Sequence, residues 1–439
     1  MNDKVSRYNI EIEYPEGTIL YNTLSDTLLP IEAKEYAVIE TLMEHLPTFQ
    51  EKYPDLYAAF RQSGFILQSD FDELAYLKLQ NRRSVYMNRN YHLTINPTLD
   101  CNLKCWYCSV DYTGTKHDKN RMSDEVVDHL LKHIHWLVTK HKSNSILLDW
   151  FGGEPLMYFN EIIKSVSDFA LPLAQQYQVD FKQQITTNAT LLDENKIKYM
   201  KEAKFNFIQI SIDGNEQRQN LIKRYANKRG TYRDVMNNIN LLTELIPDIA
   251  ICLRINYDRQ TLKDIKDIIN DFTENSRKCI MIDFQKVWQV SCTNETHKLL
   301  KETRDLFTKS GFRSRIWTYT PFRYKCCYAD SINHYVINYN GEIFKCTARD
   351  YNEKLMIGNL QNDGLISWND GIISKMFAKA TFENECCEKC RILPLCMGPC
   401  IQKNYEALIN NNQPTCIYDN PEYYLSSYVL ENAKNRNLI

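Results

Sequence analysis

From about residue 90 to 310, short apolar runs alternate with amphipathic stretches along the chain. The apolar runs have the length and composition of buried strands; they are YHLTINPT, SILLDWFGG, QITTNAT, FIQISIDG, IAICLRINYD and IMIDFQKVW. Between them, SDEVVDHLLKHIHWLVTKHK predicts a helix that begins after Ser123 and carries Asp124 and Glu125 in its first turn. This alternation predicts an α/β fold with a parallel sheet, and six strands are too few for a complete eight-stranded barrel.

Polar motifs follow several of these predicted strands. The segment CNLKCWYC (Cys101–Cys108), the tetrapeptide Gly152–Pro155, Asn188 and Asp213 each come directly after one of them. In doubly wound and barrel-like folds alike, ligands bind at the carboxyl ends of parallel strands. We therefore expect these motifs to converge at one edge of the sheet.

Residues 1–85 have a different pattern, which predicts a module of its own. NIEIEY and GTILYNTLSDTLLPI alternate like strands around a turn at Pro15-Glu16-Gly17. Helical patterns follow, with a break at Gly64, a short strand and a further helix. This order predicts a winged-helix-like module, and the alternative is a structural cap on the next domain. The predicted domains are residues 1–85, 86–315 and 316–439.

Composition excludes several classes of partner. Apolar residues make up 44% of the 439 residues, and 53 Lys and Arg nearly balance 55 Asp and Glu, for a formal charge of −2. This balance gives no reason to expect nucleic acid or a membrane surface as the main partner. No apolar run approaches the roughly 20 residues of a membrane span. The N-terminal segment has no apolar signal-peptide core, so we expect the chain in the cytoplasm.

Cysteine usage is unusual, because the 15 cysteines are clustered. Three lie between Cys101 and Cys108, and nine between Cys326 and Cys416. In a reducing cytoplasm such clusters indicate metal binding or catalysis rather than disulfides. The isolated Cys252, Cys279 and Cys292 are expected to be small buried hydrophobic residues.

The spacing C-x3-C-x2-C at Cys101, Cys105 and Cys108 supplies three thiolates from one segment. A 4Fe–4S cluster has four irons that each normally take one thiolate, so three cysteines leave one iron open for a substrate. The alternative is a zinc site completed by His or Asp. With an aromatic residue, Tyr107, before the last cysteine, the segment resembles that of the radical S-adenosylmethionine (SAM) enzymes. The resemblance covers roughly residues 90–310.

That resemblance implies a set of cofactors and roles. The open iron would chelate SAM, and an electron from an external donor such as flavodoxin or ferredoxin would cleave it to methionine and a 5′-deoxyadenosyl radical. GGEP at Gly152, Gly153, Glu154 and Pro155 matches the motif that receives the SAM amino group. The resemblance further implies that Tyr107, Asn188, Ser211, Asp213 and Arg254 bind SAM, with Tyr107 near the adenine, Ser211 and Asp213 suited to the ribose and Arg254 to the carboxylate. A structural role is the alternative for Asn188, for Ser211 with Asp213, and for Arg254.

The C-terminal cysteines resemble the SPASM extension of radical SAM peptide-modifying enzymes, which usually holds two further 4Fe–4S clusters. By motif position, auxiliary cluster II would take Cys387, Cys390, Cys396 and Cys416, and Cys386 is spare. Auxiliary cluster I would take Cys346, which ends the motif G-x4-C begun by Gly341, with Cys400 and Cys326 or Cys327. Its fourth ligand stays open: both adjacent cysteines bind, or one iron is free. A zinc ribbon is the alternative.

Two reactions fit this resemblance. One is maturation of a ribosomal precursor peptide, by a cross-link or by epimerisation, and the other is conversion of a sulfatase Cys or Ser to formylglycine. Sulfatase maturases commonly carry an aspartate directly after the G-x4-C cysteine, where this chain has Thr347, and Asp350 follows three residues later. The module at residues 1–85 favours a peptide maturase whose leader peptide binds there by strand addition. An iron–sulfur electron carrier or redox sensor is the non-enzymatic alternative.

Overall fold

The computed structural model describes residues 3–108, 120–287, 293–314, 321–413, 416–418 and 421–439. The chain divides into two compact units. The first, here called the terminal unit, combines Met1–Asn88, Ile316–Ile332 and Ser374–Ile439. The second, here called the sheet unit, combines Arg89–Arg315 and Asn333–Ile373. The C-terminal region, expected as one domain, thus contributes to both units.

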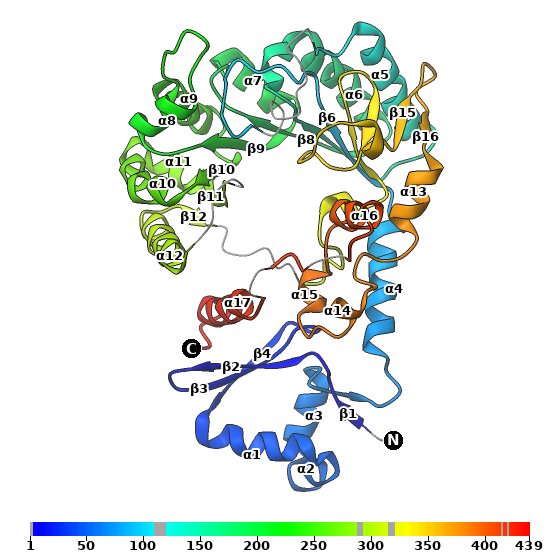
Figure 1. Ribbon diagram of the computed structural model, residues 1–439, viewed down its shortest axis with the longest axis vertical. Helices are drawn as coiled ribbons and strands as arrows, with labels where there is room; N and C mark the ends of the chain where they lie inside the picture. The colour runs from blue at the N-terminus through cyan, green and yellow to red at the C-terminus, as the bar shows by residue number, and fades with distance from the viewer. Residues whose placement is uncertain (1–2, 109–119, 288–292, 315–320, 414–415, 419–420) are drawn as a thin grey trace. The chain divides into compact units, whose positions relative to one another are not determined.

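A parallel sheet forms the centre of the sheet unit (Figure 1). Its strands are β6 (Asn90–Ile95), β7 (Ser145–Trp150), β8 (Asp180–Thr187), β9 (Phe205–Ile212), β10 (Ala250–Tyr257) and β11 (Ile280–Lys286). Each strand pairs in parallel with the one before it in the sequence. The expected α/β fold with a central parallel sheet is confirmed, and each of the six predicted apolar runs overlaps one of these strands.

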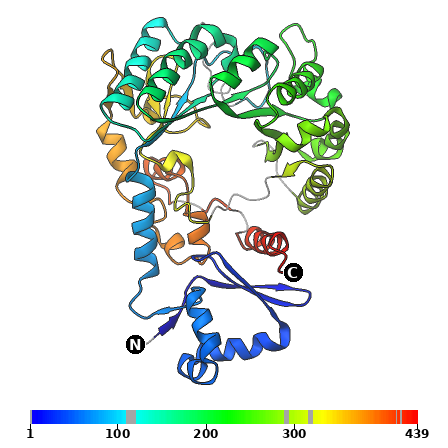
Figure 2. The ribbon, with the colours of Figure 1, turned by 180° about the vertical axis from the view of Figure 1, so that it is seen from behind.

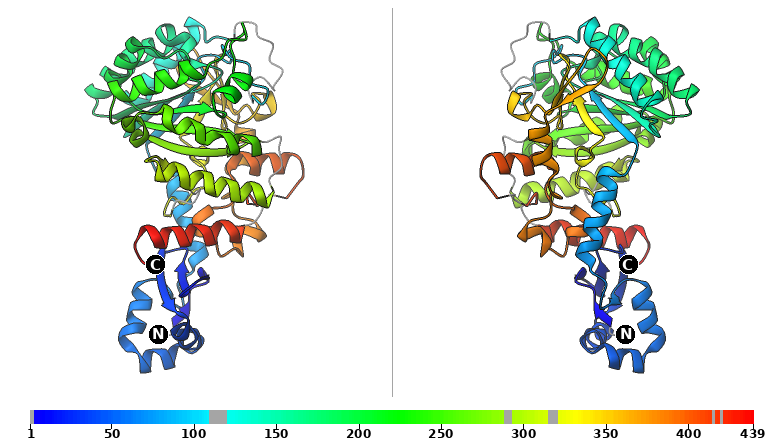
Figure 3. Two further views of the ribbon diagram at one scale, coloured as in Figure 1. Left: turned by 90° about the vertical axis from the view of Figure 1, so that its left-hand side faces the viewer. Right: turned by 90° about the vertical axis from the view of Figure 1, so that its right-hand side faces the viewer.

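Helices cover the outer side of this sheet (Figure 2), and the side view shows them together on that side (Figure 3). They are α5 (Asp124–Thr139), α6 (Ser165–Gln176), α7 (Glu194–Glu202), α8 (Glu216–Ile222), α9 (Tyr232–Leu245), α10 (Arg259–Asp264), α11 (Glu274–Cys279) and α12 (Asn294–Lys309). Helix α5 begins as predicted, because the Ser123 hydroxyl accepts a hydrogen bond from the Val126 N–H. Cys252 and Cys279 are buried, as expected of small apolar side chains, and Cys292 lies outside the described residues.

Residues 333–373 extend the central sheet beyond β6. Strand β13 (His334–Ile337) pairs with β6 in parallel, and antiparallel pairs then add β14, β15 and β16. These three strands span Glu342–Phe344, Gly358–Leu360 and Ile366–Trp368, and β12 (Arg313–Ser314) pairs with β11 at the opposite end of the sheet.

A buried histidine fastens this extension to helix α5. The two ring nitrogens of His133 lie 2.7 Å from the Gly364 carbonyl oxygen and 2.5 Å from the Tyr335 hydroxyl. The Nδ1–H donates to the carbonyl, so Nε2 accepts from Tyr335 and the ring is neutral. Burial lowers the pKa of His133 to about 4.

The terminal unit begins with a three-stranded antiparallel meander of β2 (Asn9–Tyr14), β3 (Gly17–Asn22) and β4 (Thr27–Glu32). Helices α1 (Ala33–Glu44), α2 (Leu46–Lys52) and α3 (Pro54–Gln62) follow, and α4 (Glu73–Tyr86) ends the N-terminal part. Strand β1 (Asp3–Val5) pairs with β5 (Ile66–Gln68). The C-terminal part adds η5 (Tyr328–Asp330), α14 (Glu385–Glu388), α15 (Leu393–Cys396), α16 (Ile401–Ile409) and α17 (Pro421–Asn435), while α13 (Asp370–Phe377) spans the boundary between the two units.

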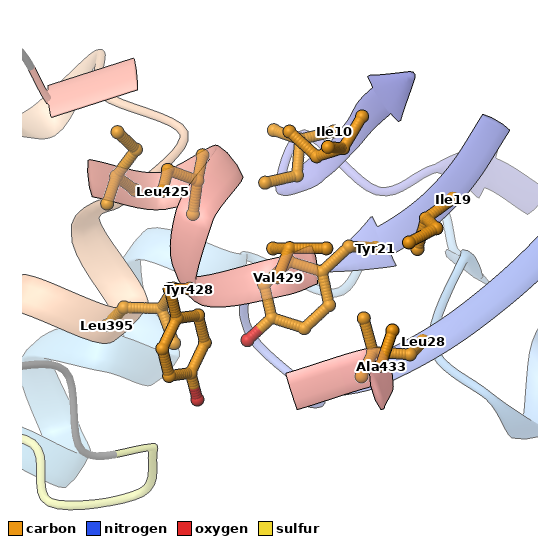
Figure 4. Packing of buried hydrophobic residues seen from close by; sticks show 11 residues of the cluster. Ile10, Ile19, Tyr21, Leu28, Leu395, Leu425, Tyr428, Val429 and Ala433 are labelled. Carbon is orange, nitrogen blue, oxygen red and sulfur yellow. The ribbon is translucent and has the colours of Figure 1, made fainter. Parts of the chain in front are cut away.

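Both faces of the meander are covered. On one face Leu20 and Ile31 join a core with Phe49 and Phe60 of the following helices. The other face packs on the C-terminal part of the unit, as Figure 4 shows. That core contains Ile10, Ile12, Ile19, Tyr21 and Leu28 from the strands, and Ile392, Leu395, Leu425, Tyr428, Val429 and Ala433 from the other end of the chain. The two ends of the sequence therefore share one hydrophobic core.

Among the described residues, no helix is both long and apolar enough to span a membrane.

His133 makes the stability of the sheet unit depend on pH. In the unfolded chain His133 binds a proton below about pH 6.5, whereas in the folded chain it binds one only below about pH 4. Between these two pH values protonation favours the unfolded chain, so the free energy of unfolding falls as the pH drops. The full loss is about 3 kcal/mol. We expect urea midpoints measured from pH 7.5 to 5 to fall less steeply for His133→Gln than for the parent. His135→Gln, at an exposed site on the same helix, is the control; an unchanged slope in His133→Gln would contradict the assignment.

Candidate cofactor site

The loop after β6 carries Cys101, Cys105 and Cys108, all partly buried. The loop is folded on itself: the Leu103 N–H donates to the Cys101 sulfur over 3.4 Å, and the Cys108 N–H donates to the Cys105 carbonyl over 3.1 Å. Burial raises the pKa of Cys101 to about 12, and the charges of Glu154 and of the other two thiols act in the same direction. Negative charge on Cys105 or Cys108 thus disfavours the thiolate of Cys101.

The segment Gly152–Pro155 lies against this loop. The Gly153 N–H donates to the Thr98 carbonyl over 3.0 Å, and the Glu154 N–H donates to the Asp100 carbonyl over 2.8 Å. A Cβ atom on Gly153 would lie 2.1 Å from the Asp100 oxygen, and Gly152 has a φ of +110°. Only glycine permits this approach of the two backbones. Pro155 starts the short helix η2 (Pro155–Tyr158).

The Glu154 side chain is fully buried and joins this segment to the end of β8. Its Oε1 accepts from the Thr187 hydroxyl at 2.7 Å and the Leu156 N–H at 3.0 Å, and its Oε2 accepts from the Asn188 N–H at 2.8 Å. Burial raises the pKa of Glu154 to about 7, and these three hydrogen bonds and the charge of Lys223 oppose the rise. Glu154 thus holds the carboxyl end of β8 beside the cysteine loop.

Asn188 contacts the cysteine loop directly. Its amide nitrogen lies 2.9 Å from Asn102 Oδ1 and 3.8 Å from the Cys101 sulfur. The Thr190 hydroxyl donates to Asn188 Oδ1 over 2.6 Å and accepts from the Asn102 amide over 2.9 Å. This closed ring of hydrogen bonds fixes the side chain of Asn188 against Cys101.

Tyr107, Asp213 and Arg254 belong to a second polar network. The Tyr107 hydroxyl donates to Asp213 Oδ2 over 2.5 Å, and the Asn256 amide donates to Asp213 Oδ1 over 3.2 Å and to the Tyr107 oxygen over 3.1 Å. The Arg254 Nε–H donates to Asn256 Oδ1 over 3.2 Å. Burial, followed by the charge of Asp213, raises the pKa of Tyr107 well above its usual value.

Ser211 is linked to this network by Lys223, which is 3% exposed. The Lys223 ammonium donates to the Ser211 hydroxyl at 2.5 Å and lies 3.6 Å from Asp213 Oδ1. A buried ammonium is stable only beside compensating charge, and Asp213 supplies it with help from Glu154.

Sequence reasoning missed Asn102, Lys223 and Asn256. Asn256 shares a face of β10 with Arg254, two residues before it, so the period of a strand could have indicated it. Lys223 lies twelve residues after Ser211, at the end of helix α8. No sequence pattern predicts that its side chain contacts Ser211 at the end of β9.

The residues at this edge fit the iron–sulfur cluster and SAM that the motif implies. Cys101, Cys105 and Cys108 are all partly buried on one loop, and a cluster with one thiolate per iron would take all three. Among the described residues, the buried Oδ1 of Asp100, beside Cys101, has no hydrogen-bond partner, so an acceptor is available to a bound group.

Cysteines of the terminal unit form a second group. Cys387, Cys390 and Cys396 are partly buried, and their charges act on one another and on exposed Cys416. Burial raises the pKa of Cys396 to about 12. The spare Cys386 is exposed beside Cys387.

Cys326 and Cys400 lie in a third group of the terminal unit. Burial and then the charge of Asp330 raise the pKa of Cys326, and the charges of Cys400 and Cys327 also contribute. Cys346 belongs to the sheet unit, where its sulfur accepts from the Ala348 N–H over 3.4 Å. The motif glycine, Gly341, has a φ of +84° in the β13–β14 turn.

Residues 95–272 match the radical SAM superfamily. The match contains the cysteine loop, Gly152–Pro155 and the strands up to β10. The chain thus contains a radical SAM domain, and the protein is an enzyme; radical SAM enzymes use SAM and a 4Fe–4S cluster.

Curated relatives share this domain. The chain is 21% identical over 334 residues to a cysteine-type anaerobic sulfatase-maturating enzyme of Clostridium novyi, covering 69% of this chain and 85% of that one. It is 22% identical over 399 residues to the radical SAM cyclopropyl synthase TigE of Paramaledivibacter caminithermalis, covering 82% and 80%.

Solved structures share the fold. The structure of native anSMEcpe with bound AdoMet matches with a TM-score of 0.56 at 19% identity, covering 79% of this chain and 97% of that one. Streptococcus suis SuiB bound to S-adenosylmethionine matches with a TM-score of 0.51 at 16% identity, covering 95% and 99%. SuiB has also been solved bound to its precursor peptide SuiA.

The buried charge of Lys223 gives a test of the network. Lys223→Met should lower the free energy of unfolding by about 3–5 kcal/mol, because it leaves Asp213 buried without its cation. Adding Asp213→Asn to this variant should restore much of the loss, which a double-mutant cycle by chemical denaturation would measure. Lys198→Met, in an exposed pair with Glu194, should cost less than about 1 kcal/mol. Additive losses from the two buried substitutions would show that they do not interact.

Proposed function

We propose that this enzyme matures a ribosomal precursor peptide, abstracting hydrogen from it and forming an intrapeptide C–C, C–O or thioether cross-link. The observation that carries this proposal is the N-terminal meander of β2, β3 and β4. It is separate from the central sheet, and among the described residues no further strand pairs with its outer strands β2 and β4. The coverage of the known structures supports it. Nearly the whole anSMEcpe structure matches this chain, but about a fifth of this chain has no counterpart in anSMEcpe. The structure of SuiB, which has also been solved with a precursor peptide, matches nearly all of this chain.

The sheet edge of the radical SAM domain would hold the reactive cofactors. Cys101, Cys105 and Cys108 would bind the cluster, and SAM on the open iron would supply a 5′-deoxyadenosyl radical. Around it, Asn188 is fixed against Cys101, and Arg254 stands beside the Tyr107–Asp213 pair. Glu154 and Asp213 are held by protein donors, so they would orient the strand ends as well as contact SAM, and Tyr107, Asn188, Ser211 and Arg254 would supply the other contacts.

The C-terminal cysteines would hold the auxiliary 4Fe–4S clusters. Cys387, Cys390, Cys396 and Cys416 would bind cluster II, and the mutual effect of their charges supports this assignment. For cluster I, Cys326 is the better candidate of the adjacent pair, because the charge of Cys400 acts on it while the Cys327 sulfur accepts from the Asp330 N–H. Cys346 stays the third predicted ligand of cluster I, and the fourth position stays open.

A leader peptide would bind to an edge of the meander, because its two faces are covered within the terminal unit. In the described residues no strand lies outside β2 or β4 in this sheet. Strand addition at such an edge supplies affinity through backbone hydrogen bonds. The N-terminal module, winged-helix-like in its order of strands and helices, would then recognise the leader.

The two edges are not equivalent. The Thr23 N–H donates to the Tyr8 carbonyl just before β2, so by alternation Glu11 and Glu13 direct their backbone groups outward, whereas those of Asn9 are bonded to Ser6 and Arg391. On β4 the outward positions include Pro30, which has no N–H to offer an added strand. We therefore place the leader on β2, where the exposed Glu11 and Glu13 favour a leader with basic side chains.

Sulfatase maturation is the second candidate, favoured by the clostridial relatives and by the fold of anSMEcpe. Against it, Thr347 occupies the position of the expected aspartate, and Asp350 is exposed with its carboxylate bonded to Asn352. Peptide epimerisation is a further alternative. A simple electron carrier does not fit an enzyme of this superfamily.

The reaction can be tested by co-expression with a short peptide encoded beside the enzyme. A loss of about 2 Da with an internal cross-link in the fragment spectra would support the proposal. An unchanged mass with an inverted residue would instead identify an epimerase, and formylglycine would identify a sulfatase maturase. Cys105→Ala should abolish 5′-deoxyadenosine formation and reduce the iron content from about 12 to about 8 per chain while leaving auxiliary absorbance.

The leader site can be tested with the labelled precursor by fluorescence anisotropy. Glu11→Pro removes one outward N–H without removing a bond between β2 and β3, so leader affinity should fall about tenfold. Pro30→Val, which adds an N–H to the β4 edge, should leave affinity unchanged. The opposite pattern would place the leader on β4. SAM cleavage without peptide should be equal in both variants and serves as the folding control.

A further inference from the structure

Asp330 lies in the terminal unit, directly after the Cys326-Cys327 pair, and is 4% exposed. Its two carboxylate oxygens have different partners. Oδ2 accepts a hydrogen bond from the Cys327 N–H over 2.8 Å, and Oδ1 accepts one from the Ile401 N–H, also over 2.8 Å. One buried carboxylate thus connects two chain segments that are 71 residues apart in the sequence.

The two N–H groups occupy equivalent positions in their segments. Each belongs to the peptide bond that directly follows a cysteine, Cys326 in the first case and Cys400 in the second. Cys400 is the N-cap of helix α16 and its side chain makes no capping hydrogen bond; the Ile401 N–H, which has no partner inside the helix, is satisfied by Asp330. The backbone next to each thiol is therefore held by the same carboxylate.

The surroundings hold Asp330 itself in place. The Asp330 N–H donates to the Cys327 carbonyl over 3.1 Å, and the Ile332 N–H donates to the Val85 carbonyl of α4 over 3.1 Å. Helix α4 also bonds to the segment before the cysteines, through Asn81 to the Tyr324 carbonyl. The turn that carries Cys326 is thus fixed on a helix, and Asp330 extends from this fixed turn to the start of α16.

We infer that Asp330 is a positioning residue for auxiliary cluster I, holding the backbones of Cys326 and Cys400 in one arrangement before iron binds. This inference rests on the auxiliary cluster in the proposed function. A preformed pair of ligands loses less conformational entropy on binding iron than two independent loops would. A fixed negative charge beside the cluster also favours its oxidised form, so Asp330 lowers the reduction potential.

The test compares Asp330→Asn and Asp330→Glu with the parent, each as the full chain purified without oxygen. Asn has the size of Asp, but its amide nitrogen cannot accept a hydrogen bond from the Cys327 or Ile401 N–H that it faces. The substitution therefore removes one of the two hydrogen bonds and the negative charge of the carboxylate. We expect iron to fall from about 12 toward about 8 per chain, with selective loss of one auxiliary cluster from the electron paramagnetic resonance spectrum. In molecules that retain the cluster, the potential should be more positive in Asp330→Asn and near the parental value in Asp330→Glu.

Amide hydrogen exchange of the iron-free chain gives a readout that does not depend on the cluster. The Ile401 amide should exchange faster in Asp330→Asn than in the parent. Asp350→Asn, at an exposed carboxylate, is the matched control and should change neither exchange, iron content nor potential. Parental exchange, iron content and potential in Asp330→Asn would overturn the inference.

The adjacent cysteines separate this inference from the proposed function. Cys326→Ala should lose auxiliary cluster I, and Cys327→Ala should keep it. If the parental protein itself holds only about 8 irons, the cluster assignment fails. Faster Ile401 exchange in Asp330→Asn would then still establish the bridge between the two segments, whereas the cluster role of Asp330 would be overturned with the assignment.

Discussion

The fully buried Glu154 carboxylate is the interaction on which the organisation of the radical SAM site depends. A buried carboxylate is tolerated only when its oxygens are satisfied, and here the donors come from β8 and from the turn after β7. Because the Glu154 N–H is bonded to Asp100, the same residue also fixes the loop that carries the cysteines. Three segments at the carboxyl edge of the sheet are thus held at one point, before any cofactor binds.

The same device recurs at two other places. Asp213 gathers Tyr107, Asn256 and Lys223, and Asp330 bridges the segments of Cys326 and Cys400. In each case a buried carboxylate, rather than apolar packing, connects the chain segments. The segments at these places are rich in polar groups or thiols. The energetic cost of burying the charge is offset by several directed hydrogen bonds, which also specify one geometry. Thiol-bearing loops without regular secondary structure need such local specification.

The sequence predicted what depends on local pattern. Apolar runs and capping residues correctly located β6 to β11 and the start of α5, and the residues expected after the strands, the cysteine loop, Gly152–Pro155 and Asn188 among them, contact one another. It did not predict the contacts between distant segments. Nothing in the period of residues 333–373 shows that they extend the central sheet, because three-residue strands carry almost no signal. Lys223 and Asp330 were missed for a related reason. The fold, and not a local sequence pattern, brings each of them next to its partners.

The shared core of the terminal unit has a thermodynamic consequence. Strands β2 to β4 bury Ile10 and Tyr21 against Leu395 and Val429, next to Cys396 of the proposed cluster II. A ligand that binds only the folded form of a cooperative unit stabilises all of it. Under the proposed function, iron bound at the C-terminal cysteines would therefore stabilise the N-terminal sheet as well, and a leader strand added to β2 would stabilise the cysteine-rich segment in return. The shared hydrophobic core would then couple peptide recognition to auxiliary-cluster assembly.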